Sequence, residues 1–210
     1  MEWRNPWMAS PPRPGRIWLD VGAHLGEKTL AEAQADPSLM IYAFEPNLRA
    51  AMRMVGKAPN YIVVPAAVGE IEGAADFYLN EYEEASSLLP LDPAGLQEWT
   101  GGERLRVRRV LTVPVIRLDT FMELAEINEV DFLKVDAQGM DLAVVRSAGN
   151  RIRNVRRICI EVQVTPRSVY KGATAKEEAL DYLREAGFEL ESEEPQSLAQ
   201  EENLTFVRCP

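Results

Sequence analysis

Two acidic residues lie on either side of a glycine-containing turn near the start of the chain. Asp20 closes the apolar run at residues 17–19, and Glu45 ends the next apolar run along the chain. Gly22 and Gly26 bracket the turn, where the absence of a Cβ permits a sharp bend and the close approach of a ligand. A carboxylate at the end of the second run can accept hydrogen bonds from both hydroxyls of a ribose. The pattern therefore predicts a nucleoside site.

The spacing of this turn argues against a ligand that contains a pyrophosphate. A dinucleotide-binding turn has the pattern G-x-G-x-x-G, but His24 and Glu27 stand at the second and third glycine positions. The G-K-[ST] sequence of a Walker loop is also absent. S-adenosylmethionine is a nucleoside ligand without phosphate, and the free N–H groups at the start of the following helix favour its carboxylate. We therefore expect this cofactor rather than NAD.

Strands and helices alternate along the chain and would position these residues. Short apolar runs predict strands at residues 17–19, 39–45, 61–66, 131–136 and 155–162, and helices are expected at 27–35, 47–56, 119–127, 140–148 and 173–186. Such alternation is typical of a mostly parallel sheet covered by helices on both faces. Pro46 and Asn47 mark the start of the second helix, and Asp119 can cap a later one. Residues 188–192 and 204–208 are expected to form a closing hairpin around an acidic loop.

The alternation is interrupted after the third strand. Residues 74–80 are strand-like where a helix is expected, and residues 81–103 form a long excursion that contains Ser86 and Ser87. Long loops in compact domains often act as lids over a site, although a polar loop without a function is the simpler interpretation. Residues 106–118 are again strand-like, so we expect a strand-rich insertion here.

Composition limits the partners and the location of the protein. The 210 residues carry a net charge of −10, which argues against a nucleic-acid partner. Arginines at residues 104–109 alternate like a strand with one solvated face, and an acidic partner is the less favoured interpretation. Cys159 and Cys209 show no metal or redox spacing, and the chain has no long apolar span, so we expect a cytoplasmic protein without a membrane partner.

The domain organisation is expected to be simple. Residues 1–14 are Pro-rich and are expected to form an arm, and residues 15–210 are expected to form a single domain. Trp3 and Trp7 in the arm could dock on this domain or on a second subunit, which leaves a homodimer open.

Four blocks of the sequence resemble the FkbM-type family of S-adenosylmethionine-dependent methyltransferases. They are D-V-G-A-H-L-G, F-E-P-N, the S-S-L of the excursion, and V-P-V-I-R-L-D-T-F followed by V-D-F-L-K-V-D-A-Q-G-M-D. The resemblance implies a class I methyltransferase fold: a Rossmann-like, seven-stranded, mostly parallel sheet with one antiparallel strand. It also implies methyl transfer, usually to a hydroxyl. Two features depart from the family pattern, because Asp141 stands where glutamate is common and little chain precedes the first strand.

The predicted cofactor site combines the glycine turn with the ends of several strands. Glu45 is assigned to the ribose, Ala67 to the flank of the adenine, and Asp20 to the amino-acid part or to ordering the turn. Asp136 and Gln138 would face the methionine part and the acceptor. The full set of expected cofactor residues is Asp20, Gly22, His24, Gly26, Glu45, Pro46, Asn47, Ala67, Asp136 and Gln138.

A hydroxyl acceptor benefits from a general base, and four side chains are candidates. Asp136 is preferred and Glu161 is second. His24 is better explained by ordering of the turn, and Asp141 by its favourable place in the first turn of a helix. Asp136 and Glu161 could instead hold a Mg²⁺ ion that binds a diol, but we expect no metal.

The sequence thus predicts O-methylation of a hydroxyl on a small molecule or a carbohydrate, with S-adenosylmethionine as the donor. Two alternatives remain open. One is a methyltransferase-like fold with a non-catalytic binding role, because fold alone does not settle function. The other is an NAD-dependent oxidoreductase, against which His24 and Glu27 weigh.

Overall fold

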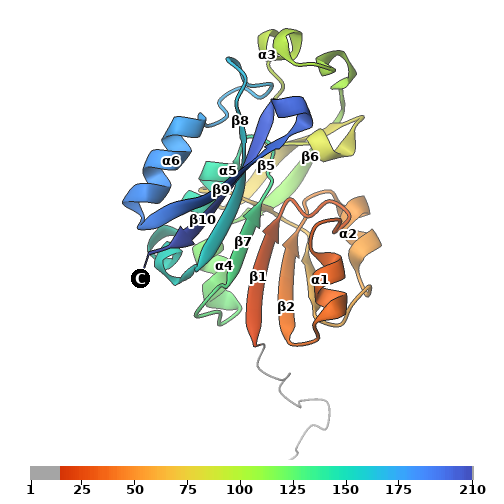
Figure 1. Cartoon of the computed structure of the whole chain (residues 1–210). Helices are drawn as coiled ribbons and strands as arrows, with labels where there is room; N and C mark the ends of the chain where they lie inside the picture. Colours follow the sequence, from red (N-terminus) through yellow and green to blue (C-terminus); the bar gives the residue numbers. More distant parts are fainter. Residues whose placement is uncertain (1–14, 210) are drawn as a thin grey trace, which may run out of the picture.

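A seven-stranded sheet forms the centre of the molecule, with the strand order β3-β2-β1-β7-β8-β10-β9 (Figure 1). The computed structural model describes residues 15–209. The strands are β1 (Arg16–Val21), β2 (Leu39–Phe44), β3 (Tyr61–Val64), β7 (Phe132–Val135), β8 (Arg157–Gln163), β9 (Phe188–Gln196) and β10 (Glu201–Arg208). The first five pair in parallel, and β10 is antiparallel to both of its neighbours. The predicted class I methyltransferase fold with one antiparallel strand is confirmed.

Helices cover both faces of this sheet because each central strand is apolar on both sides for most of its length. The helices α1 (Leu30–Ala35) and α2 (Leu48–Met54) pack on one face, and α4 (Leu118–Leu124), α5 (Asp141–Arg146) and α6 (Lys176–Glu185) pack on the other. The larger core lies between the second face and its three helices. This packing leaves the carboxyl ends of the parallel strands uncovered.

The alternation of side chains along the strands places the polar groups of the site together. Leu19 of β1 and Leu133 of β7 are buried in the larger core. Since successive side chains point to opposite faces, Asp20 and Lys134 lie on the other face, where the strand register pairs them directly. Glu161 lies on that same face of β8, because its neighbours Ile160 and Val162 are in the core.

The expected strand-rich insertion is a second sheet of three strands with the order β4-β6-β5. Its strands are β4 (Ala67–Val68), β5 (Gly73–Asn80) and β6 (Val107–Ile116). Between β5 and β6 lies the excursion, with α3 (Pro93–Glu98) between the 3₁₀ turns η1 (Glu83–Ala85) and η2 (Gly102–Arg104). Asp92 caps α3 by accepting a hydrogen bond from the Ala94 N–H. In Figure 1, α3 lies at the same end of the molecule as the turn of the β9–β10 hairpin.

Several predicted boundaries were wrong. The closing hairpin is longer than expected, because β9 and β10 continue through the acidic segment to a short 3₁₀ turn, η4 (Ser197–Ala199). A further 3₁₀ segment that was not predicted, η3 (Gly149–Asn154), follows α5. Asp119 does not cap α4; the helix begins one residue earlier, and the Asp119 carboxylate forms an ion pair with Arg117 at 2.7 Å. The arm with Trp3 and Trp7 lies outside the described residues. Within residues 15–209, no helix is long and apolar enough to cross a membrane.

Candidate functional site

A cavity of about 370 Å³ opens at the carboxyl ends of the parallel strands, beside the glycine turn. The strands β1, β2 and β7 and the short strand β4 contribute to its wall. This is where open α/β sheets bind their ligands. The expected cofactor residues that line the cavity are Gly22, His24, Glu45, Pro46, Ala67, Asp136 and Gln138. Asp20, Gly26 and Asn47 are not among the lining residues.

The two glycines of the turn have different surroundings. Gly22 has a φ of +73°, and a Cβ at this residue would lie 1.9 Å from the Asp136 carbonyl oxygen. A side chain at Gly22 is therefore excluded by the neighbouring strand end as well as by the backbone conformation. Gly26 has a φ of +81°, and its nearest side chains are Leu30 and Tyr61, both at 3.1 Å from an added Cβ. The close approach at Gly26 is thus to the core of the protein and not to the cavity.

Asp20 lies beneath the turn and is 1% exposed. Its Oδ2 accepts a hydrogen bond from the Thr29 hydroxyl, and its Oδ1 lies 3.1 Å from Lys134 Nζ. The same ammonium donates to the Gly22 carbonyl oxygen at 3.0 Å. Burial lowers the pKa of Lys134, but the charges of Asp20 and Asp136 outweigh burial and hold this pKa above its ordinary value. These contacts match the second of the expected roles of Asp20, the ordering of the turn.

Glu45 presents a buried carboxylate at the end of β2. Its Oε2 accepts a hydrogen bond from the His24 N–H at 2.9 Å, and its Oε1 accepts one from the Asn47 N–H at 2.7 Å. Burial raises the pKa of Glu45 to about 7, while the two N–H donors oppose that shift. The carboxyl group therefore titrates near neutral pH and joins the glycine turn to the start of α2. Asn47 caps that helix by accepting from the Arg49 N–H, which is the expected helix start.

His24 lies at the rim of the cavity with a left-handed backbone, φ 47°. Its Nδ1 lies 3.0 Å from a Glu27 oxygen and 3.9 Å from a Glu84 oxygen. Donor atoms of the three side chains lie within 4.8 Å of one another, so the group could hold a metal ion. Glu27 also accepts a hydrogen bond from the Leu25 N–H at 3.0 Å. Both oxygens of Glu27 therefore already have partners within the protein.

A carboxyl pair lies at the ends of β7 and β8. The amide of Gln138 donates to Asp136 Oδ1 at 2.8 Å and to Glu161 Oε2 at 3.1 Å. The Gln138 Oε1 lies 2.7 Å from the Tyr170 hydroxyl, which orients the amide nitrogen toward the two acids. Burial and then the charge of Asp136 raise the pKa of Glu161. Glu161 therefore stays protonated to a higher pH than an exposed glutamate does.

Asp141 organises the loop between β7 and α5. Its carboxyl oxygens accept hydrogen bonds from the backbone N–H groups of Ala137, Gly139 and Glu161 at 3.2–3.3 Å. Burial, and then the charge of Asp136, raise the pKa of Asp141 to about 7. Asp141 does not line the cavity beside the glycine turn. Its place in the first turn of α5 was expected, but its long-range contact with β8 was not.

A second cavity, of about 300 Å³, adjoins the first and was not predicted. The two cavities share Glu84, Asp136 and Gln138. The excursion and the β9–β10 turn build the outer wall of the second cavity; the lining residues missed by sequence reasoning include Tyr82, Trp99, Tyr170, Leu198, Gln200 and Glu201. The only sequence signal for them was the length of the excursion. Of the two serines there, Ser86 lines the first cavity, and Ser87 is buried and donates to the Gln138 carbonyl oxygen at 2.7 Å.

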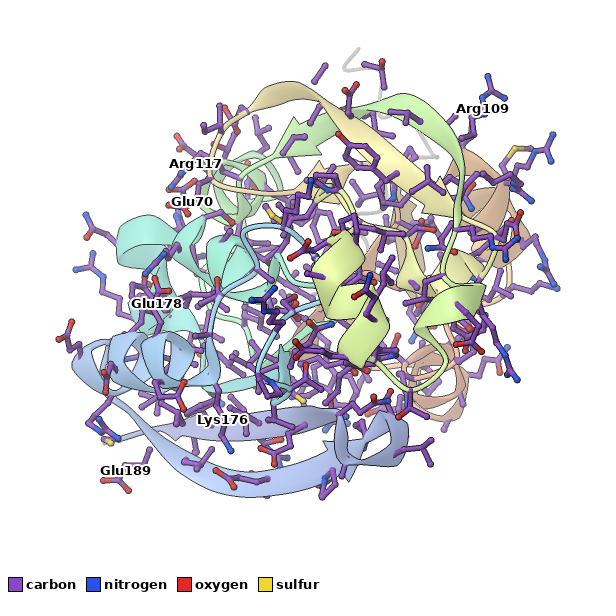
Figure 2. All side chains as sticks on the ribbon, turned by 90° about the horizontal axis from the view of Figure 1, so that it is seen from above. Glu70, Arg109, Arg117, Lys176, Glu178 and Glu189 are labelled. Carbon is purple, nitrogen blue, oxygen red and sulfur yellow. The ribbon has the colours of Figure 1, made fainter. Side chains whose placement is uncertain are left out.

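The basic cluster is solvated, but the predicted strand with one exposed face was wrong, because Arg104 lies in η2 and Arg108 and Arg109 lie at the start of β6, where both faces are exposed. Residues 106–110 are exposed, and Arg108 forms an ion pair with Glu83 at 3.1 Å. The Arg109 side chain extends outward at the edge of the molecule, away from the strand ends (Figure 2). The cluster therefore does not contribute a positive group to the walls of the two cavities.

Comparison with known proteins agrees with this architecture. The model of the methyltransferase FkbM domain matches residues 20–190. A curated relative, the 2-O-methyltransferase NoeI of Sinorhizobium fredii, is 23% identical over 197 residues, which is 89% of this chain and 77% of the relative. Two solved structures share the fold. The fibrillarin/Nop5p complex aligns with a TM-score of 0.51, 14% identity and coverage of 94% and 75% of the two chains. Aeropyrum pernix fibrillarin with bound S-adenosyl-L-methionine aligns with a TM-score of 0.50 and 15% identity, and the alignment covers 93% of this chain and 67% of the fibrillarin chain.

Proposed function

We propose that this chain, which belongs to the FkbM methyltransferase family, transfers the methyl group of S-adenosylmethionine to a hydroxyl oxygen of a small molecule or a sugar. The observation that carries the proposal is the position of Asp136, whose side chain lines both cavities. A methyl donor in the first cavity and a hydroxyl in the second would meet at this carboxylate. The name of the relative NoeI, a 2-O-methyltransferase, agrees with a hydroxyl acceptor.

The residues of the first cavity fit S-adenosylmethionine. Glu45 offers a carboxylate for the ribose hydroxyls, and Gly22 lines the cavity beside it at the glycine turn. Ala67 and Val68 supply an apolar flank for the adenine. Five acidic side chains line this cavity, against two lysines and His24, which suits a sulfonium cation and opposes a pyrophosphate; the acids are Glu27, Glu45, Glu83, Glu84 and Asp136. The cofactor, when bound, supplies an electrophilic methyl carbon.

In this proposal, Asp136 is the general base. It would accept the proton of the acceptor hydroxyl and so make the oxygen nucleophilic, while bound S-adenosylmethionine would supply the methyl group and leave as S-adenosylhomocysteine. Glu161, whose raised pKa favours its protonated form, lies beside it, and the Gln138 amide donates to both carboxyl groups and positions them. Lys134 Nζ lies 3.7 Å from Asp136 Oδ2 and stabilises its charge from the side of the cofactor cavity. The walls of the two cavities would hold the two reactants in line with each other.

Thermal unfolding with S-adenosylmethionine, S-adenosylhomocysteine and NAD is the first test. A ligand at 100 times its dissociation constant stabilises the fold by about 2.7 kcal/mol, which corresponds to a rise in Tm of roughly 5–10 °C in a chain of this size. We expect this rise with the two sulfur ligands and not with NAD. Transfer of a labelled methyl group to hydroxylated acceptors then tests the reaction. A rise with NAD alone would support the oxidoreductase, and binding without transfer to any acceptor would support a non-catalytic role.

A further inference from the structure

The second cavity has the position of an acceptor site but an unusual distribution of charge. Four carboxyl groups line it, those of Glu84, Asp136, Glu161 and Glu201. Among residues 15–209, no lysine, arginine or histidine lines this cavity. Lys134, the nearest cation to Asp136, lines only the first cavity. An anionic group in the second cavity would therefore meet negative charge without a positive partner.

Two of these carboxyl groups are shielded from solvent and lie close to Asp136. Glu201 is 7% exposed, and Glu161 is partly buried beside Asp136. Burial and the charge of Asp136 raise the pKa of Glu161 and of Glu201. The raised pKa favours the neutral carboxyl groups, and a ligand that brings a positive charge would favour their ionised form and be stabilised by it.

The remaining wall suits a compact hydroxylated ligand. The half-buried Trp99 and the exposed Tyr82 line the cavity, and aromatic rings attract both cations and the C–H faces of polar rings. Tyr170 and Gln138 add a hydroxyl and an amide near the carboxyl pair. The Gln200 Oε1 accepts from the Thr100 N–H at 2.6 Å, which joins the β9–β10 turn to the excursion at the outer wall of the cavity.

We propose, on the basis of the function proposed above, that this cavity binds the acceptor and that it selects hydroxylated molecules by charge. The bound end of the acceptor is cationic or uncharged, and an acceptor with a phosphate or carboxylate there is rejected. Glu84, Glu161 and Glu201 are the residues that determine this specificity, because each places a carboxyl group in a cavity without a basic side chain. An amino group beside the reacting hydroxyl gives the tightest binding.

Saturation-transfer NMR on an equimolar mixture of glucosamine, glucose and glucose 6-phosphate tests the selection. The sample contains the full chain with S-adenosylhomocysteine at pH 6.5, and EDTA removes metal ions. We expect binding to decrease in the order glucosamine, glucose, glucose 6-phosphate, with the phosphate bound at least roughly tenfold more weakly than the amine. Equal or stronger binding of the phosphate, or binding of none of the three, would overturn the proposal.

Glu84→Lys locates the effect in the cavity. The Glu84 side chain is 47% exposed, so the variant is expected to fold. It should reduce the preference of amine over phosphate from tenfold to within about threefold. Glu81→Lys is the matched control, because Glu81 is exposed, lies on the same segment and lines neither cavity. Equal loss of preference in both variants would show an effect of net charge and would overturn the proposal.

Calorimetry with S-adenosylhomocysteine on the same wild-type sample separates the two proposals. If this ligand fails to bind, the proposed function is wrong. If it binds while the preference of amine over phosphate is absent, the proposed function stands and only the selection by charge is overturned.

Discussion

Glu45 is the residue whose ionisation is expected to control cofactor binding near neutral pH. Its two oxygens already accept backbone N–H groups, and burial raises its pKa to about 7. Ribose hydroxyls donate hydrogen bonds, and such donors favour the ionised carboxylate. The affinity for S-adenosylhomocysteine should therefore rise with pH. We expect it to be roughly tenfold weaker at pH 6 than at pH 8, because about one carboxyl group in ten is ionised one pH unit below its pKa.

The Glu45→Gln variant isolates this effect. Its affinity at pH 8 should be on the order of 10–100-fold weaker than that of the wild type, because a charged acceptor is lost. It should also lose the dependence on pH. Glu32→Gln on the exposed side of α1 is the control and should bind S-adenosylhomocysteine like the wild type at both pH 6 and pH 8. Calorimetric titration measures all three proteins, and unchanged affinity in Glu45→Gln would remove Glu45 from the site.

Asp136 is expected to act in the chemical step and not in folding. Asp136→Asn keeps the size of the side chain but removes its capacity to accept a proton. We expect turnover to fall by 10²–10⁴-fold, the usual contribution of a general base. The affinity for S-adenosylhomocysteine should change by less than about tenfold, because Glu45 and the glycine turn are intact. Methyl transfer at a normal rate in this variant would mean that Asp136 is not the base.

Strands, helices and turns could be predicted where the sequence pattern that specifies them is local. The glycine turn follows a buried strand and precedes a helix, so Gly22 and Glu45 could be placed from spacing alone. The second cavity could not be placed in this way. Its wall depends on the contact of Tyr170 with Ala85 and of Gln200 with Thr100, which join residues 85 and 100 positions apart. The pattern of apolar residues also gave no indication that β9 and β10 extend through an acidic segment, because that hairpin is held by backbone pairing at an exposed edge.

The turn between β1 and α1 should tolerate no side chain at Gly22. In Gly22→Ala, the new Cβ meets the Asp136 carbonyl oxygen at 1.9 Å, so β1 and β7 must separate. Gly56 has nearly the same backbone, φ +77°, but nothing lies within 4 Å of an added Cβ. Gly56→Ala should therefore cost only the backbone strain of about 1–2 kcal/mol. We expect Gly22→Ala to lose at least twice as much stability in urea unfolding and to lose cofactor binding. Equal losses in the two variants would mean that conformation alone requires the glycine.

The whole molecule carries both an excess of acidic groups and several buried carboxyl groups with raised pKa values. Burial raises the pKa of Glu45 and Asp141 to about 7, and that of Glu161 and Glu201 is also raised. A raised pKa means that the folded state binds more protons than the unfolded state between the ordinary value and the raised one. The free energy of unfolding must then fall as the pH rises through this window.

We therefore expect the Tm of the free protein to be higher at pH 6 than at pH 8. Each loss of about 1 kcal/mol lowers Tm by roughly 2–4 °C in a chain of this size. Repulsion among surface charges, which gives a net charge of −10, contributes too, but salt screens exposed charges far more than buried ones. The decline in Tm should accordingly persist in 0.5 M NaCl and should be smaller in Glu161→Gln, whose amide cannot ionise. A Tm that is constant between pH 6 and pH 8 in high salt would mean that ionisation of these carboxyl groups does not lower the free energy of unfolding. The cluster around Asp136 would then be more open to water than its burial indicates.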